Sequence, residues 1–252
     1  MENNNVSIPK TSTALAALFR ADIATMVSNR RSVIITLVVP IMILISWKDI
    51  AQKLGGAYAL STAIGIGLMS IGLMGYSLAI ARDRDKGIFQ RLRVAPLPSW
   101  AIMVSRIAIQ LAMISILNLA IFIVGYQVDK VTLTGSGYVA AFFVSFLGGA
   151  VYLSMGQLIV GLVKNPETVN ATVRLVYFLF IMIGMFGELG LLGNYVKEGI
   201  HWTPYGSVKL MIAASMNPAT WNKDATTALL LSLGYIVVFA GIGINKFRWS
   251  PK

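Results

Sequence analysis

Residues 55–81 read GGAYALSTAIGIGLMSIGLMGYSLAIA, a run without a charged side chain, and residues 82–86 then read RDRDK. An α-helix needs roughly 20 apolar residues to cross the hydrocarbon core of a bilayer. The run is therefore long enough to span a membrane with some tilt, and the charges after it mark a water-facing boundary. This stretch predicts an all-α membrane protein rather than a water-soluble globule.

The composition of the whole chain supports this fold class. Of the 252 residues, 56% are apolar and 12% are charged, whereas a soluble domain keeps roughly a quarter of its residues charged. The net charge of +11 would favour nucleic-acid binding in a soluble domain. Here the basic residues lie at the ends of apolar runs rather than along one face, so we expect no nucleic-acid partner. The absence of cysteine excludes disulfides and thiolate metal sites.

Apolar runs separated by charge recur along the chain. We predict six transmembrane helices, at about residues 32–47, 55–81, 107–125, 138–163, 173–193 and 225–245. The third is placed after Arg106 because a charge inside the bilayer is costly. Residues 1–252 are expected to form a single transmembrane domain.

Three further segments are too polar or too broken to span. Residues 1–12 are expected to be a flexible tail. Residues 13–30 repeat apolar side chains at helical spacing and predict an amphipathic helix in the membrane interface, with an ordinary surface helix as the alternative. Asp22 falls among the apolar positions without an evident reason. Residues 194–224 contain Pro204 and Pro218 and predict a re-entrant or interfacial helical segment, since backbone inside a bilayer must be shielded by protein.

Lysine and arginine are distributed unevenly between the two sides of this topology, and cytoplasmic loops carry the excess. We therefore place both termini and the loop 82–100 in the cytoplasm, with the chain in the cell (inner or plasma) membrane. The richer side holds Lys10, Arg20, Arg30, Arg31, Arg82, Arg84, Lys86, Arg91, Arg93, Arg106, Lys164, Arg174, Lys246, Arg248 and Lys252. The other side holds Lys48, Lys53, Lys130, Lys197, Lys209 and Lys223.

Few residues suggest catalysis. The sequence holds no G-x-x-x-x-G-K-[ST] phosphate-binding pattern, so we expect no ATP site, bound cofactor or metal on this chain, and no enzyme activity of its own. His201 lacks partners at ligand spacing. Glu188 is the one acidic residue inside a predicted span, towards its outer end. It is either the coupling carboxylate of an ion-driven secondary transporter or a solvated or cavity-facing residue.

The loop after the second predicted span has a pattern typical of a docking element. Residues 82–98 read RDRDKGIFQRLRVAPLP. A short helix would place Phe89 and Leu92 on one side, ringed by charge, with Pro96 and Pro98 ending it. Such a knob would fit an apolar notch on another protein.

This loop resembles that of the permease subunits of ABC exporters of the type-2 membrane-domain class. The family's loop typically reads Glu-Arg-Glu-Arg/Lys-Gly-Thr-Leu-Glu-Arg-Leu, followed by Thr/Ala-Pro-Leu. The chain departs from it at Ile88 and Gln90, where Thr and Glu are usual. The resemblance implies that the loop couples the chain to a separate nucleotide-binding ATPase subunit, which holds ATP and Mg. The implied coupling residues are Asp83, Asp85, Lys86, Gly87, Phe89, Arg91, Leu92 and Pro96.

The resemblance further implies a dimer, expected to be a homodimer, that exports an amphipathic drug, lipid, glycolipid or peptide by alternating access. The pathway would lie between two copies of the chain, along the second and fifth spans. Its candidate residues are Met69, Met74, Phe178, Met182, Met185, Phe186 and Glu188; packing against helices or lipid is the alternative role. Gly65, Gly67, Gly72 and Gly75 would permit close helix approach. A membrane-anchored interaction protein without transport is a third alternative.

Overall fold

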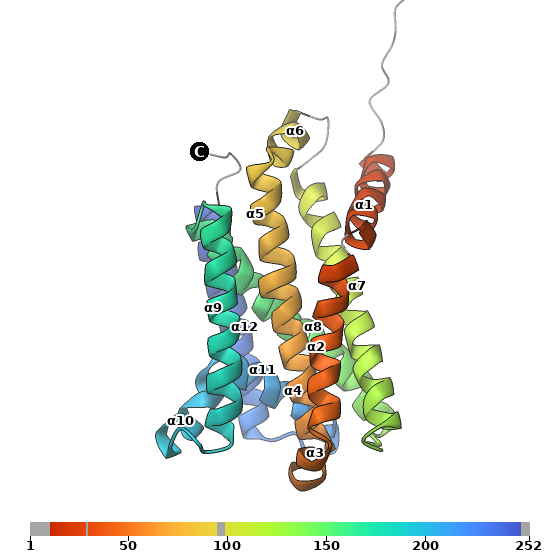
Figure 1. Ribbon diagram of the computed structural model, residues 1–252, viewed down its shortest axis with the longest axis vertical. Coiled ribbons are helices and arrows are strands. Elements are labelled where there is room, and N and C mark those ends of the chain that lie inside the picture. The colour runs from red at the N-terminus through yellow and green to blue at the C-terminus, as the bar shows by residue number, and fades with distance from the viewer. Residues whose placement is uncertain (1–10, 29, 95–98, 248–252) are drawn as a thin grey trace, which may run out of the picture.

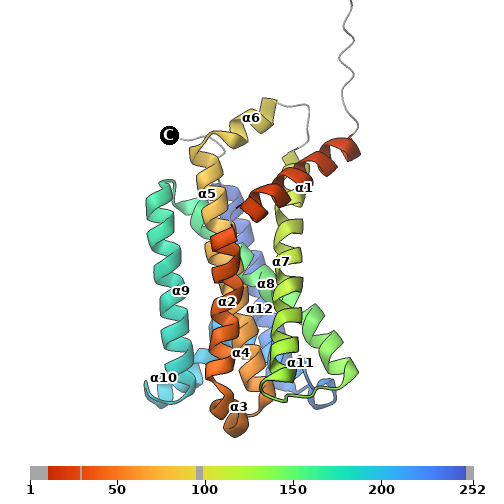
Figure 2. The same ribbon diagram turned by 45° about the vertical axis from the view of Figure 1, so that its right-hand side comes forward.

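The computed structural model describes residues 11–28, 30–94 and 99–247, and within these ranges every regular element is a helix. The long helices run side by side as an upright bundle (Figure 1). At one end lies α6 (Ile88–Val94), and α1 (Thr11–Ser28) runs obliquely beside it (Figure 2). At the opposite end lie α3 (Lys48–Leu54) and α10 (Asn194–Gly199). We call these the α6 end and the α10 end.

Five helices of the described residues are long and apolar enough to cross a membrane, which confirms an all-helical membrane protein. The second predicted span is built from α4 (Gly56–Met69), the π-helix η1 (Ser70–Ser77) and α5 (Leu78–Asp85). The others are α7 (Ser99–Gln127), α8 (Gly135–Leu162), α9 (Pro166–Glu188) and α12 (Lys223–Lys246). They correspond to the predicted runs 107–125, 138–163, 173–193 and 225–245.

Two of the long helices have different bounds from the predicted spans. α7 begins at Ser99 instead of residue 107 and carries Arg106 within it, because acidic neighbours neutralise that charge, as described below. α9 begins at Pro166 because the Asn165 side chain accepts hydrogen bonds from the backbone N–H groups of Glu167 and Thr168 and caps the helix. It ends at Glu188 instead of residue 193, before a turn with positive φ at Gly190 and Gly193.

The first predicted span corresponds to α2 (Arg30–Ser46), a helix that contains Pro40. Among the residues whose side chains the structure describes, its apolar segment is Thr36–Ser46, which is shorter than the five long apolar helices. Seen in both views, α2 stands upright beside the second-span helix (Figures 1 and 2). α2 packs on α4 and α7.

The segment 194–224 folds as short helices, as its broken pattern predicted. After α10 come η2 (Ile200–Trp202), α11 (Pro204–Ser215) and η3 (Pro218–Thr220). Thr203 caps α11 by accepting the N–H of Gly206 at 3.1 Å. α11 packs against α4, α8 and α12, so protein shields its backbone, as expected of non-spanning helix at membrane depth.

The second-span helix occupies the middle of the bundle, and 78% of its most apolar window is buried within the chain. Its centre is the π-helix η1, which packs on α8 and α9. Long π-helical stretches are rare, and π turns inside α-helices occur frequently at functional sites. The element that precedes the loop 82–100 is thus the core of the protein.

Two of the four predicted close-approach glycines make such contacts. A Cβ at Gly72 would lie 2.5 Å from the backbone carbonyl carbon of Tyr152, and a Cβ at Gly67 would lie 2.5 Å from a Leu117 methyl carbon. Gly65 has nothing within 4 Å, and around Gly75 the nearest atom is 3.7 Å away. Close approach between helices therefore explains Gly67 and Gly72 only.

We predict that Gly72→Ala lowers thermal stability in detergent, because the methyl group would force η1 away from α8. Overpacking of this kind costs about 1–3 kcal/mol. Gly65→Ala in the same helix is the matched control, and it should be neutral or slightly stabilising because alanine has the better helix propensity. Equal melting temperatures for the two variants would show that the η1–α8 contact is less tight than described.

Candidate functional site

Arg106 of α7 joins three elements at the α6 end. Its guanidinium contacts the Asp22 carboxylate of α1 at 3.3 Å and the Asp83 carboxylate of α5 at 2.7 Å. The neighbouring Ser105 hydroxyl donates a hydrogen bond to Asp22 at 2.6 Å. The otherwise unexplained Asp22 is therefore an ion-pair partner of Arg106, and α1 is connected by charge to the end of the second-span helix.

The predicted loop helix is present as α6, and Gly87 makes the turn into it. Gly87 has a φ of +66°, which glycine adopts without steric cost, and its N–H donates to the Arg84 carbonyl at 3.1 Å. The side chains of Asp85, Lys86 and Arg91 are exposed. These predicted coupling residues therefore offer a charged surface at the α6 end. Pro96 and the side chain of Leu92 lie outside the described residues.

Phe89 does not form the exposed knob that the sequence pattern predicted. Its side chain is 0% exposed, and its ring contacts the Phe247 ring edge-on at a centroid distance of 6.1 Å. The residue that follows α12 therefore covers the Phe89 ring of α6. Burial of a large aromatic ring inside the subunit is more favourable than its exposure to water, so Phe89 holds α6 in place rather than projecting from it.

Arg84 is a residue of this site that sequence reasoning missed. It is only 3% exposed, and its guanidinium donates hydrogen bonds to the backbone carbonyls of Val160, Val163 and Lys164 at 2.7–2.8 Å. These carbonyls lie at the C-terminal end of α8, where helix carbonyls lack intrahelical partners and attract cations. Arg84 thereby fixes the base of α6 to α8. Arg84 lies within the run of alternating charges at residues 82–86, and nothing in that run distinguishes a buried arginine from an exposed one.

A second network lies at the α10 end. Glu188, the last residue of α9, forms an ion pair with Lys209 of α11. The Tyr58 hydroxyl of α4 donates a hydrogen bond to Glu188 at 2.8 Å. The Lys209 ammonium lies 3.3 Å from the centroid of the Tyr58 ring, a cation–π contact. The Trp47 ring also stacks on the Tyr58 ring, at a centroid distance of 6.2 Å.

Both charges of this second network are shielded from water. The side chain of Lys209 is 5% exposed and that of Glu188 is 11% exposed. Glu188 is therefore not the solvated residue that the sequence suggested. The distribution of charge along the sequence assigned Lys209 only to the side of the membrane with fewer basic residues. The one sequence signal for its role was a lone lysine in the apolar stretch of α11.

The candidate pathway residues do not share one surface in a single chain. Met69 is completely buried in the second span, whereas Phe178 and Phe186 of α9 are 57% and 40% exposed. Met74 is half-buried. Met182 and Met185 are also half-buried. The structure thus brings the α9 residues to an exposed apolar face and places Met69 in the core.

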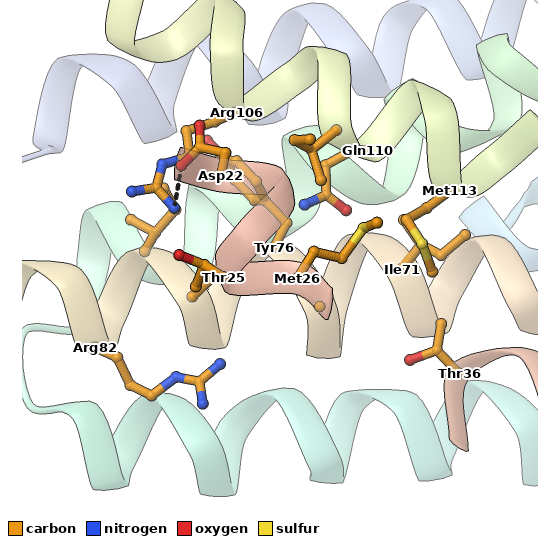
Figure 3. A pocket seen from close by; sticks show the side chains of 14 residues that line it. Asp22, Thr25, Met26, Thr36, Ile71, Tyr76, Arg82, Arg106, Gln110 and Met113 are labelled. Carbon is orange, nitrogen blue, oxygen red and sulfur yellow. Dashed lines mark ion pairs between the residues drawn. The ribbon is translucent and has the colours of Figure 1, made fainter. Parts of the chain in front are cut away.

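A cavity of about 110 Å³ lies at the α6 end, between α1, α2, the second-span helix and α7. Figure 3 shows the Asp22–Arg106 pair beside it, with Met26, Ile71 and Met113 around its apolar part. It lies on the α1 and α7 side of the second-span helix, whereas α9 lies on the other side (Figures 1 and 2). The cavity is therefore separate from the exposed face of α9.

The apolar helices, the buried second span and the charge networks at both ends define a multi-pass helical membrane protein. A model of the family described as "ABC-2 family transporter protein" matches residues 4–244, so the chain belongs to that family. It is a permease subunit of an ABC transporter, a membrane component that works with an ATPase partner. This confirms the resemblance carried by the loop. No curated protein matches the chain closely enough to count as a relative.

Proposed function

We propose that two copies of this permease, with two cytoplasmic ATPase subunits, export an amphipathic substrate by alternating access. The observation that carries the proposal is the construction of α6. Its base is fixed to α8 by Arg84 and its apolar side is buried through Phe89, while Lys86 and Arg91 stay exposed. A helix held rigidly on the second span, with a charged outer surface, suits the transmission of force from a bound ATPase.

The proposed topology has six spans, with α2 as the first and α1 lying in the interface. The α6 end is cytoplasmic, since the basic excess falls there, and both termini lie on that side. The oblique course of α1 (Figure 2) supports an interfacial position. The Asp22–Arg106 pair would hold α1 at the membrane boundary, where α7 extends past the hydrocarbon core.

The proposed pathway runs along α9, where it faces the second copy of the chain. The exposed apolar residues Phe178 and Phe186 support this assignment, and α9 packs directly on η1 and α5. Motion of the second span would therefore reach α9 through direct contact. Because Met69 is buried within one chain, we remove it from the pathway and retain Met74, Met182 and Met185 at its margin.

The outer closure of the pathway is assigned to Glu188, Lys209 and Tyr58. Their contacts join the end of α9 to α11 and α4. Gly184 supports the same junction, since a Cβ there would lie 2.5 Å from the Tyr205 ring. Opening towards the outside requires α9 to leave this position, so the ion pair sets part of the free-energy difference between the closed and open states.

The alternative, an ion-coupled secondary transporter using Glu188, is disfavoured by the same contacts. A coupling carboxylate must exchange its proton or cation with the solution during transport. The ammonium of Lys209 already neutralises Glu188, and Tyr58 donates to it. The carboxylate therefore has a resident cation within the chain.

Co-purification tests the proposed function. We expect the tagged chain, solubilised from native membranes, to bring down a stoichiometric ATPase of about 25–35 kDa, the size of one to two domains. Inverted vesicles from the same membranes should accumulate an amphipathic dye only with hydrolysable ATP. A chain that purifies alone, and whose transport follows an imposed ion gradient without ATP, would overturn the exporter proposal in favour of a carrier.

A further inference from the structure

The cavity between α1, α2, the second-span helix and α7 has its charged side chains at one end, and at the other end apolar side chains with the uncharged Thr36 and Gln110 (Figure 3). Met26, Ile71 and Met113 provide apolar walls, while Asp22, Arg82 and Arg106 provide charges. Figure 3 shows the charged and apolar groups at different places along the helices. A cavity of this kind is complementary to a molecule with a charged head and a hydrocarbon tail.

The charges of the cavity select an anionic head. Arg106 is neutralised by both Asp22 and Asp83. Arg82 donates through Nε to the Leu78 carbonyl at 3.1 Å, and among the described residues no carboxylate lies within ion-pair distance of its guanidinium. Its terminal N–H groups are therefore available, and their planar arrangement matches phosphate and carboxylate oxygens.

The surroundings favour a membrane amphiphile over a soluble anion. The cavity lies beside α1 at the arginine-rich end of the spanning helices, where lipid headgroups meet the hydrocarbon core. Methionine side chains adapt to irregular apolar ligands, and Met26 and Met113 approach the cavity from α1 and α7 (Figure 3). A hydrocarbon chain there would pack simultaneously on α1 and on the second span.

We propose that this cavity binds part of an anionic membrane amphiphile, with its head on Arg82 and the few methylene groups nearest the head among Met26, Ile71 and Met113. The phosphate of a phospholipid and the carboxylate of a free fatty acid share the required chemistry. Binding would stabilise the packing of α1 against the second span. The proposal goes beyond the exporter function, since it concerns the side of the second span that faces away from α9 and requires no ATPase.

Photolabelling of the purified full chain in nanodiscs tests the proposal. The probes are phosphatidylglycerol and phosphatidylcholine with the same diazirine acyl chain, and a diazirine fatty acid. We expect the phosphatidylglycerol probe to label peptides containing Met26, Ile71 or Met113 more strongly than phosphatidylcholine does. Arg82→Gln should reduce that preference about tenfold, the effect of losing a charge-assisted hydrogen bond. Lys197→Gln, at the α10 end, is the charge control and should change nothing.

A second variant tests the position of the tail independently of the head. Met113→Trp fills the apolar end of the cavity and should abolish labelling by every probe. Leu119→Trp should preserve labelling, because the Leu119 side chain of α7 is 53% exposed and lies outside the cavity. Labelling by only one of the two anionic probes, lost in Arg82→Gln, would support the proposal and identify the source of the ligand. Cavity labelling by phosphatidylcholine that equals that of both anionic probes and is unchanged by Arg82→Gln would overturn it, as would the absence of cavity labelling by either anionic probe. Cavity labelling that persists in Met113→Trp would also overturn it.

Discussion

Replacing Lys209 with methionine should lower the free energy of unfolding by about 3–5 kcal/mol, because it leaves the Glu188 carboxylate buried without its partner. Lys209 and Glu188 are 5% and 11% exposed, so solvent does little to compensate the remaining charge. Glu188→Gln should destabilise the chain similarly by orphaning the ammonium. Thermal unfolding of the purified chain in detergent measures both effects.

The double variant Glu188→Gln/Lys209→Met separates the ion pair from the shape of the site. We expect it to regain most of the lost stability, since replacing a whole buried pair by neutral groups is often close to neutral. Lys197→Met, at an exposed position of α10, is the matched control. Two outcomes would show that the two charges do not interact as described. One is that the single variants have the same melting temperature as this control. The other is that the double variant loses as much stability as the two single variants together.

The same variants report on the proposed outer closure. If the pair holds α9 against α11, its loss makes the outward-open state easier to populate. We therefore expect the double variant to be folded, yet to show a higher rate of ATP hydrolysis that is poorly coupled to export. A stable double variant with unchanged coupling would confine the pair to a structural role.

We expect Arg91→Glu to abolish co-purification of the ATPase and ATP-driven export without lowering the melting temperature. The Arg91 side chain is exposed on α6, where the proposed partner binds, so reversing its charge affects the partner rather than the fold. Lys197→Glu, an exposed charge reversal at the opposite end, should retain both activities. Full ATP-dependent export by Arg91→Glu would refute the coupling assignment.

Phe89→Ala should have a different outcome from Arg91→Glu, although both residues belong to the same predicted motif. Phe89 is buried against Phe247, and truncation of a buried phenylalanine costs about 3–5 kcal/mol. We expect this variant to lower thermal stability and to expose α6 to proteolysis. Weak ATPase binding by Phe89→Ala with unchanged stability would instead indicate the exposed knob that the sequence suggested.

The length and polarity of the apolar runs were sufficient to predict most of the architecture. The second span and α8 follow from uncharged stretches of bilayer length, and α6 follows from the short helix predicted before Pro96 and Pro98. The boundaries of α7 and α9 were predicted less well. Arg106 was placed at the interface, before the third predicted span, because a charge inside the bilayer is costly. A single sequence does not show that Asp22 and Asp83 neutralise this arginine within α7.

The candidate site was predicted only where it depends on local sequence. The exposed charges of Lys86, in the turn before α6, and of Arg91, in α6, lie close together in the sequence, and the motif located them. The roles of Lys209, Arg84 and Phe89 depend on contacts between helices distant in the chain. Such pairings are set by the rotation of each helix about its axis, which an apolar run of this composition leaves undetermined.

The π-helix η1 gives the second span a property that a uniform α-helix lacks. The hydrogen-bonded turn of a π-helix encloses one residue more than that of an α-helix. Ser70–Ser77 therefore contains more residues per turn than the α-helices on either side of it. Rewinding one such turn as α-helix would transfer about 1.5 Å of rise and about 100° of rotation to everything beyond it. A change between π-helix and α-helix in η1 would thus rotate and shift α5 and α6 together without breaking the helix.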